Sequence, residues 1–98
     1  MPTHEEEPRF SRDWESLTPA QQRQFLIVRP LFVQGLRSQP RQFDPRLRVK
    51  RVQGRLGVWE MSWAADGRAT FQYGEEIVPG ETHVIWRRIG THRIFREP

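Results

Sequence analysis

Residues 59–73 read WEMSWAADGRATFQY and carry the clearest periodic pattern in the chain. On both sides of Ala-Ala-Asp-Gly, apolar side chains occupy every second position, which is typical of strands with one buried face. A three-residue loop over 65–67, with Gly67 in the left-handed region, brings both apolar sets onto the same face. This register predicts that Trp63 lies opposite Ala69, Met61 opposite Phe71, and Trp59 opposite Tyr73.

The other face of this hairpin is polar, and a third strand over 47–52 extends it. If Val49 lies opposite Met61, Lys50 lies opposite Glu60, where an exposed ion pair is the structural alternative to a functional role. The segment GRLG over 54–57 matches the GxxG motif, but it joins two strands and is interpreted as a turn. The polar face is then predicted to carry Arg48, Lys50, Glu60, Ser62, Arg68, Thr70 and Gln72.

A fourth strand is predicted over 82–89, and its orientation stays open because both alternating sets mix apolar with polar residues. If Ile85 and Ile89 face the core, Trp86 and Arg88 join the polar face, where Trp86 is placed to stack on a nucleobase. The other orientation buries Trp86. The strand runs into RRIGTH, which places His92 among arginines.

Two helices are predicted ahead of the strands. Phe10, Trp14 and Leu17 form the apolar stripe of a short helix. Thr18-Pro19-Ala20-Gln21 combines an N-cap, a proline at the first helical position and a capping-box glutamine, so a second helix is expected from Pro19 towards Ser38. Pro30 lies inside it and predicts a kink near 27–29 or a split.

These elements predict an α+β fold in which two N-terminal helices cover one face of a twisted antiparallel sheet of about four strands. Ninety-eight residues fill one core, so residues 1–98 are expected to form a single domain. The first eight residues are a poor strand, and we expect them to be poorly ordered or a frayed edge strand.

The amino-acid composition limits the classes of function that the chain can have. No cysteine is present and the three histidines are dispersed, so a metal site is not expected. The chain shows neither a leader-like N-terminus nor a membrane-spanning apolar run, which indicates a cytoplasmic protein without a membrane partner.

Residues 18–98 carry fourteen basic and seven acidic residues, and fifteen of the sixteen basic residues are arginine. Arginine makes bidentate contacts with phosphate, so nucleic acid is the favoured partner; a solvated basic surface is the alternative.

His92 is the best-placed candidate for proton transfer. An imidazole can exchange a proton near neutral pH, and the guanidinium groups of Arg68 and Arg48 suit the oxygens of a phosphodiester. This combination can cleave RNA without a metal. The structural alternative is that His92 merely ends a strand.

The helix and strand order, with the segments LRVKRVQG, GVWEMSWAADGRATFQYG and HVIWRRIGTH, resembles the RelE/ParE superfamily of bacterial toxins. It looks most like the RelE/YafQ branch of mRNA interferases. Arg68 matches the arginine after the hairpin turn in RelE, and Ile89-Gly90-Thr91-His92 is similar to the histidine-bearing C-terminal motif of YafQ. The resemblance implies a type II toxin that acts as a ribosome-dependent mRNA endoribonuclease without a cofactor. Its implied partners are a cognate antitoxin, the ribosome and mRNA.

The resemblance also implies roles for individual residues. His92 would act as general acid or base, and Arg68 and Arg48 would stabilise the charge of the phosphorane. Glu60 and His83 are the candidates for the second proton-transfer group, because the additional histidines of YafQ have no counterpart at matching positions. The expected RNA-binding residues are Lys50, Arg88, Trp86 and Phe95.

Two other functional classes remain open. One is a ParE-like toxin that inhibits DNA gyrase and has no nuclease chemistry. The other is a noncatalytic basic RNA-binding module, whose affinity would fall steeply with salt.

Overall fold

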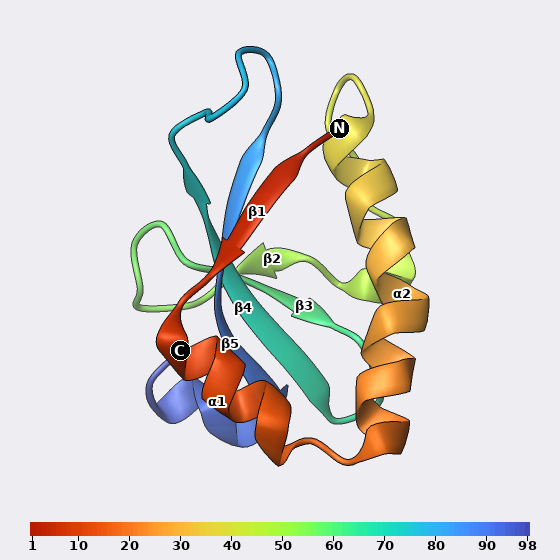
Figure 1. Cartoon of the computed structure of the whole chain (residues 1–98), viewed down its shortest axis with the longest axis vertical. Helices are drawn as coiled ribbons and strands as arrows, with labels where there is room; N and C mark the ends of the chain where they lie inside the picture. Colours follow the sequence, from red (N-terminus) through yellow and green to blue (C-terminus); the bar gives the residue numbers. More distant parts are fainter.

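The computed structural model describes residues 1–98 and contains one five-stranded sheet with two α-helices against it (Figure 1). Along the sheet the strand order is β1-β5-β4-β3-β2, with β1 parallel to β5 and all other neighbours antiparallel. The predicted α+β fold is confirmed, and the sheet gains a fifth, parallel strand. The elements are β1 (Thr3–Glu6), α1 (Pro8–Ser16), α2 (Pro19–Arg37), β2 (Lys50–Arg51), β3 (Trp59–Ser62), β4 (Gly67–Gly74), β5 (His83–Thr91), and the 3-10 helices η1 (Pro45–Leu47) and η2 (His92–Arg96).

The predicted start of α2 is confirmed by a complete capping box. The Thr18 hydroxyl accepts a hydrogen bond from the Gln21 amide at 3.1 Å, and the Gln21 side chain accepts one from the Thr18 amide at 2.8 Å. The helix runs without a break through Pro30 to Arg37, so the predicted split does not occur. Pro30 is exposed, where the Leu26 carbonyl that loses its helical donor can be hydrated. Neither helix is both long and apolar enough to cross a membrane.

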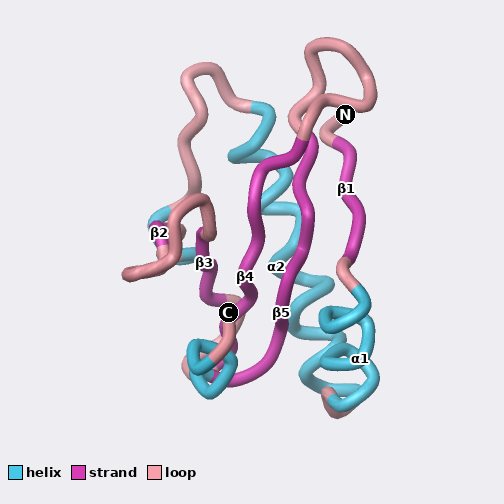
Figure 2. The backbone as a smooth tube through the Cα atoms, turned by 90° about the vertical axis from the view of Figure 1, so that its left-hand side faces the viewer, coloured by secondary structure: helices cyan, strands magenta, loops and turns pink.

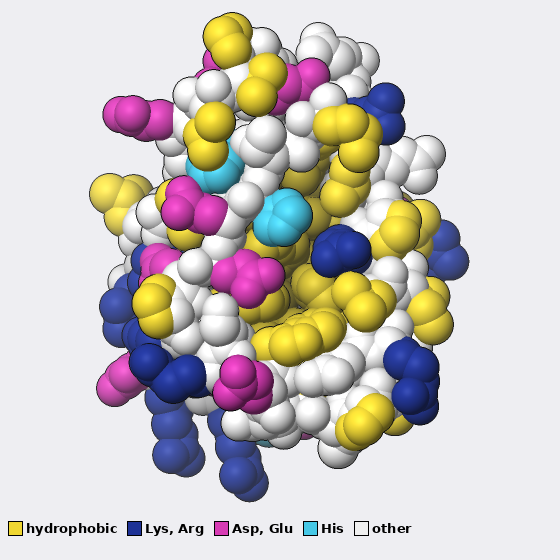
Figure 3. Space-filling view, viewed as in Figure 1, with side chains coloured by type: hydrophobic (Ala, Val, Ile, Leu, Met, Phe, Trp, Pro, Cys, Tyr) yellow, Lys and Arg dark blue, Asp and Glu magenta, His cyan; other side chains and the backbone are white.

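Aromatic rings from both helices and the sheet form the core. The Trp86 ring lies 5.1 Å from that of Phe32, 5.6 Å from that of Phe71 and 5.8 Å from that of Phe10. The Trp86 side chain is only 4% exposed, so its expected position on the polar face is wrong. Figure 3 shows apolar side chains in a hollow between β1 and α2, where Trp86 and Phe32 line the surface.

The β3–β4 hairpin keeps the predicted faces but not the predicted register. Trp59 lies opposite Phe71 and Met61 opposite Ala69, a shift of two residues that leaves every side chain on the same face. The loop is 64–66, and Gly67 begins β4 instead of taking a left-handed turn. A Cβ on Gly67 would lie 2.6 Å from the indole ring of Trp63, so close packing of that ring excludes a side chain there.

The predicted pairing of Lys50 with Glu60 between β2 and β3 is confirmed, but β2 is shorter than expected. Leu47, predicted as the first residue of this strand, instead ends η1, and Arg48 follows it with φ of 49°. The segment over 54–57 is a turn, as interpreted, with positive φ at both glycines.

A β-bulge in β5 resolves the orientation that the sequence leaves open. Thr70 lies opposite Arg88 and Phe71 opposite Trp86, so Arg87 is the extra residue between them. Because the bulge changes the alternation, Trp86 on one side and Ile89 on the other both face the helices and are buried. Neither of the two strictly alternating orientations is therefore correct.

The N-terminal residues form a paired edge strand. All four residues of β1 lie beside β5, and the imidazole of His83 joins the two strands through side chains. Its Nδ1 lies 2.7 Å from the Thr3 hydroxyl and its Nε2 lies 2.8 Å from the Glu5 carboxylate. These bonds compensate for the low strand propensity of the segment.

Candidate active site

The candidate site lies on the polar face of the sheet, where the β3–β4 loop meets the end of β5. Strand pairing places two rows of side chains across this face. Ser62 lies opposite Arg68, which lies opposite Gly90. The next row contains Lys50, Glu60, Thr70 and Arg88.

His92 forms a hydrogen bond with Asp66 at the edge of this face. Gly67 pairs with Thr91 in the last rung of the β4–β5 ladder, so Asp66 and His92 follow as the next facing residues. The Nδ1 atom of His92 lies 2.7 Å from Oδ1 of Asp66, and the two side chains are 68% and 60% exposed. This hydrogen bond is the main cause that lowers the pKa of Asp66, and the nearby Arg68 charge adds a smaller contribution.

The Asp66 carboxylate can hold the His92 imidazole in one orientation for proton transfer. With Asp66 ionised, the proton on Nδ1 faces the carboxylate, and Nε2 is left to exchange a proton with a substrate. The exposure of both groups leaves room for a large substrate such as a nucleic acid strand. The structure thus shows an exposed imidazole beside a carboxylate that can orient it.

Arg68 is held beside this pair by the hairpin loop. Its Nη1 donates to the carbonyl oxygens of Gly67 at 2.9 Å and of Ala64 and Ala65 at 3.3 Å. No carboxylate forms an ion pair with it, and its other nitrogen donors make no hydrogen bond. A guanidinium that is fixed on one side and free on the other is suited to bind an anion such as phosphate.

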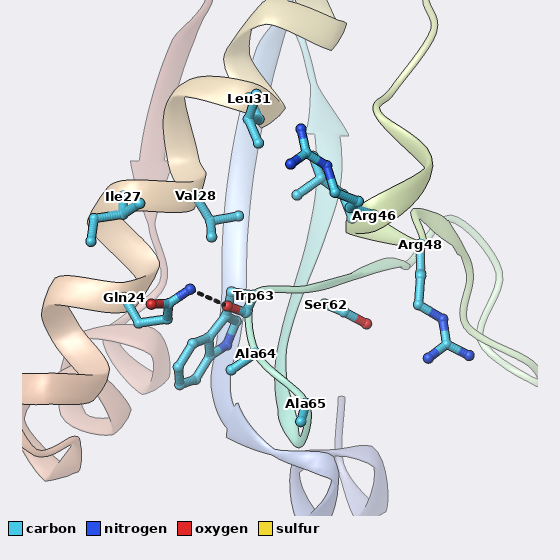
Figure 4. A pocket seen from close by; sticks show the side chains of 11 residues that line it. Gln24, Ile27, Val28, Leu31, Arg46, Arg48, Ser62, Trp63, Ala64 and Ala65 are labelled. Atoms are coloured by element: carbon cyan, nitrogen blue, oxygen red, sulfur yellow. Dashed lines mark hydrogen bonds between the residues drawn. The ribbon is translucent and has the colours of Figure 1, made fainter.

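Arg48 lies farther along the same face, beyond Ser62. Both residues line a groove at the edge of the sheet, and Figure 4 shows the Ser62 hydroxyl on the side where Arg48 lies. Arg48 is exposed and makes no side-chain hydrogen bond or ion pair. No ion pair joins Lys50 to Glu60 either, so the Glu60 carboxylate is free on the polar face.

Besides Trp86, two residues expected in the site, Arg88 and His83, are not available for it. Arg88 forms a bidentate ion pair with Asp13 of α1, at 2.6 and 3.1 Å, and is 20% exposed, so it is not free to bind RNA as expected. His83 is 2% exposed and begins β5, whereas His92 follows its end. The strand residues between them, 84–91, separate the two histidines by roughly 25–30 Å, which rules out His83 as a proton-transfer partner of His92.

The C-terminal segment covers part of the polar face, which is therefore less open than expected. Figure 2 shows η2 and α1 on opposite sides of β5, and η2 packs against both β4 and β5. Ile94 is buried beside Gly90, and Thr70 is fully buried without a hydrogen-bond partner for its hydroxyl. Phe95 lies in η2 and is partly exposed.

Comparison with known proteins identifies the fold of this chain. No family model and no curated protein matches the sequence. Among solved structures, YafQ from E. coli is similar with a TM-score of 0.64 at 15% identity, over 95% of this chain and 96% of that chain. A YoeB/ParE toxin from Agrobacterium tumefaciens is similar with a TM-score of 0.66 at 14% identity, over 92% and 98%. A chain of the E. coli DinJ–YafQ toxin–antitoxin complex gives a TM-score of 0.63 at 15% identity, over 94% and 93%.

This chain has the RelE/YafQ fold. The likeness extends over nearly the whole length of each chain. The fold expected from the sequence resemblance is confirmed. At identities of 14–15%, the site must be argued from the residues of this chain.

Within the RelE/YafQ fold, Asp66 is the site residue that sequence reasoning missed. The sequence pattern indicates only that Asp66 lies in the loop over 65–67. The feature that identifies Asp66 is the register of β4 against β5. In this register Gly67 lies opposite Thr91, so the next residues, Asp66 and His92, face each other. Finding that register requires the bulge at Arg87, which the alternation of β5 does not reveal.

Proposed function

We propose that this chain is the toxin of a type II toxin–antitoxin system and that it cleaves mRNA on the ribosome. The observation that carries the proposal is the His92–Asp66 hydrogen bond beside the free donors of Arg68. The fold shared with YafQ and with a YoeB/ParE toxin supports a toxin role. Ribosomes and mRNA would place its action in the cytoplasm.

The proposed reaction is an internal transesterification of RNA. The ribose 2′-oxygen attacks the adjacent phosphorus while a base removes the 2′ proton, and the bond from phosphorus to the 5′-oxygen breaks. An acid donates a proton to that leaving oxygen. The products are a 2′,3′-cyclic phosphate and a 5′-hydroxyl, so atoms and charge balance without a metal or cofactor.

His92 supplies one of these proton transfers through Nε2, with Asp66 holding Nδ1. The free donors of Arg68 stabilise the charge that develops on the phosphorane oxygens, and Arg48 adds positive charge from beyond Ser62. Glu60 is the remaining candidate for the second proton transfer, because its carboxylate is unpaired on the same face.

Two residues are assigned to RNA binding. Lys50 lies on the polar face beside Glu60 and binds the RNA backbone. Phe95 of η2 is placed to stack on a nucleobase next to the scissile linkage, three residues after His92.

The proposed partner is a cognate antitoxin that blocks this face. YafQ forms a toxin–antitoxin complex with DinJ, which supports a protein partner for a chain of the same fold. An antitoxin is needed for the producing cell to survive the cleavage activity.

Toeprinting of a translated message with purified protein tests the function. We expect cuts in ribosome-bound mRNA that require His92, with the His92→Ala rate lower by about 10² to 10⁴. His4→Ala is the matched control, because His4 is exposed on β1 and belongs to no part of the site. Unchanged cleavage by His92→Ala would refute the assigned mechanism, and the absence of cleavage by the wild type would refute the function.

The second candidate is inhibition of DNA gyrase, because one structure of this fold is described as a YoeB/ParE toxin. A supercoiling assay with purified gyrase separates the two. Loss of supercoiling with intact ribosome-bound mRNA would favour gyrase inhibition.

A further inference from the structure

Three arginines, Arg9, Arg87 and Arg88, bind the residues that follow η2, and we call them the arginine clasp. Nη2 of Arg9, on α1, donates to the carbonyl oxygen of Glu97 at 2.9 Å, and Nη1 of Arg88, on β5, donates to the same oxygen at 3.0 Å. Arg87 donates to the carbonyl oxygen of Pro98 from Nη2 at 3.1 Å and from Nε at 3.3 Å. Hydrogen bonds from charged donors are stronger than those between neutral groups, so this segment is held firmly.

Asp13 of α1 fixes one member of the clasp. Strand β1 ends opposite Trp86, so the outer edge of β5 has no strand partner beyond that residue. Oδ2 of Asp13 accepts from the Ile89 amide at 3.1 Å and from Nε of Arg88 at 2.6 Å, and Oδ1 accepts from Nη2 of Arg88 at 3.1 Å. The same guanidinium thus binds α1 through two nitrogens and Glu97 through the third.

The segment η2 has few other contacts that fix it. It is a 3-10 helix of five residues, and helices this short are not stable alone. Ile94 holds its middle by packing beside Gly90. His92 is 68% exposed, and its side chain makes one hydrogen bond, to Asp66, which is 60% exposed. The β4–β5 ladder fixes the chain before η2, and the clasp fixes the chain after it.

We propose that the arginine clasp positions His92, with Arg9 and Arg88 as positioning residues. By binding the carbonyl of Glu97, these arginines keep η2 wound and hold the imidazole against Asp66. The consequence for catalysis rests on the proposed function, whereas the positioning of the imidazole does not. The alternative is that these arginines only stabilise the whole fold.

Two variants loosen the clasp in different ways. Arg88→Lys keeps a positive charge beside Asp13, but one ammonium group cannot reach that carboxylate and Glu97 together. Arg9→Ala removes the other donor to Glu97 and leaves the Asp13 ion pair in place, so the protein still folds if Arg88→Lys does not. Arg12→Ala is the matched control, because Arg12 is exposed on the same helix and belongs to no ion pair.

Limited trypsin digestion of the full-length protein tests whether the clasp holds η2. Trypsin cleaves after arginine, and η2 contains Arg93 and Arg96, whose side chains are exposed. Arg23, inside α2, is the internal reference for unfolding of the rest of the chain. We expect Arg88→Lys and Arg9→Ala to raise cleavage in η2 by about fivefold or more relative to cleavage after Arg23. A role in overall stability alone would raise cleavage at all these sites together.

Long-range ¹H–¹⁵N spectra at alkaline pH test the position of the imidazole itself, because they show which ring nitrogen carries the proton. While Asp66 accepts from His92, that proton lies on Nδ1. Without this bond the proton distributes over both nitrogens, so we expect the Nε2 form to increase in both variants. His83 is 2% exposed and lies far from η2, so its signals should not change.

In the mRNA cleavage assay, both variants should lower kcat about tenfold with little change in KM, because a displaced catalytic group affects the chemical step. Unchanged trypsin cleavage in η2, an increase that Arg23 shares, an unchanged His92 tautomer or an unchanged kcat would overturn the proposal. Faster mRNA cleavage by the variants would also overturn it, since the clasp would then be inhibitory. If the wild type cuts no mRNA but both variants loosen η2 and change the tautomer, the positioning stands and the nuclease function falls.

Discussion

Replacing Asp66 by asparagine tests whether this carboxylate acts through His92. Asparagine keeps the shape and can still accept from Nδ1, but it removes the negative charge 2.7 Å from the imidazole. Carboxylates that orient a metal-binding histidine typically contribute 10- to 100-fold, and we take this range as the starting point for Asp66. Because Asp66 and His92 are more than half exposed, water screens the pair, and we expect the low end, about a tenfold fall in kcat with little change in KM.

The assay is mRNA cleavage measured in a double-mutant cycle with His92→Ala. If Asp66 only positions the imidazole, Asp66→Asn has no further effect once His92 is absent. Glu75→Gln is the matched control, because Glu75 is an exposed carboxylate after the far end of β4. An equal fall in rate in both backgrounds would show that Asp66 acts on the substrate itself, and the reasoning would be refuted.

Three further outcomes are expected. Arg68→Lys should lower kcat/KM about 10²-fold, because an ammonium group cannot donate hydrogen bonds to the loop carbonyls and to a phosphate at the same time. A rate equal to wild type in the cleavage assay would contradict this. Trp86→Ala should cost about 3–5 kcal/mol in urea unfolding, and a loss under about 1 kcal/mol would contradict its burial. Arg46 lowers the pKa of Asp44 to about 2, so Asp44 stabilises the fold above its ordinary value of 3.8 and loses this effect as pH falls through 2. Thermal melts should show Asp44→Asn below wild type at pH 7, with a difference that shrinks as pH falls from about 4 to about 2.

The sequence predicts most of the fold because local signals agree. The capping box at Thr18 starts α2 where expected, and alternation along β3 and β4 assigns their faces correctly. Register is predicted less well, since a shift of two residues preserves every face and leaves the apolar pattern unchanged. In the observed register the Trp63 ring packs over Gly67, and the apolar pattern of the sequence does not indicate this contact.

The candidate site is predicted in part for the same reason. Arg68, Ser62 and Glu60 lie on the polar face because strand alternation fixes their side. Trp86 is misplaced because the bulge at Arg87 interrupts that alternation. The pairing of Arg88 with Asp13 joins residues 75 positions apart, and one sequence alone offers no signal for it.

The bulge in β5 connects the stability of the fold with the geometry of the site. Without it, strict alternation would send either Trp86 or Ile89 to the polar face, so the extra residue Arg87 lets both enter the core. The same extra residue sets the register beyond it, in which Gly90 faces Arg68 and Asp66 faces His92. A glycine opposite Arg68 presents no side chain that competes for the guanidinium, and Ile94 fills the space above Gly90. The placement of the His92–Asp66 pair beside the unpaired Arg68 thus follows from a packing requirement of the core.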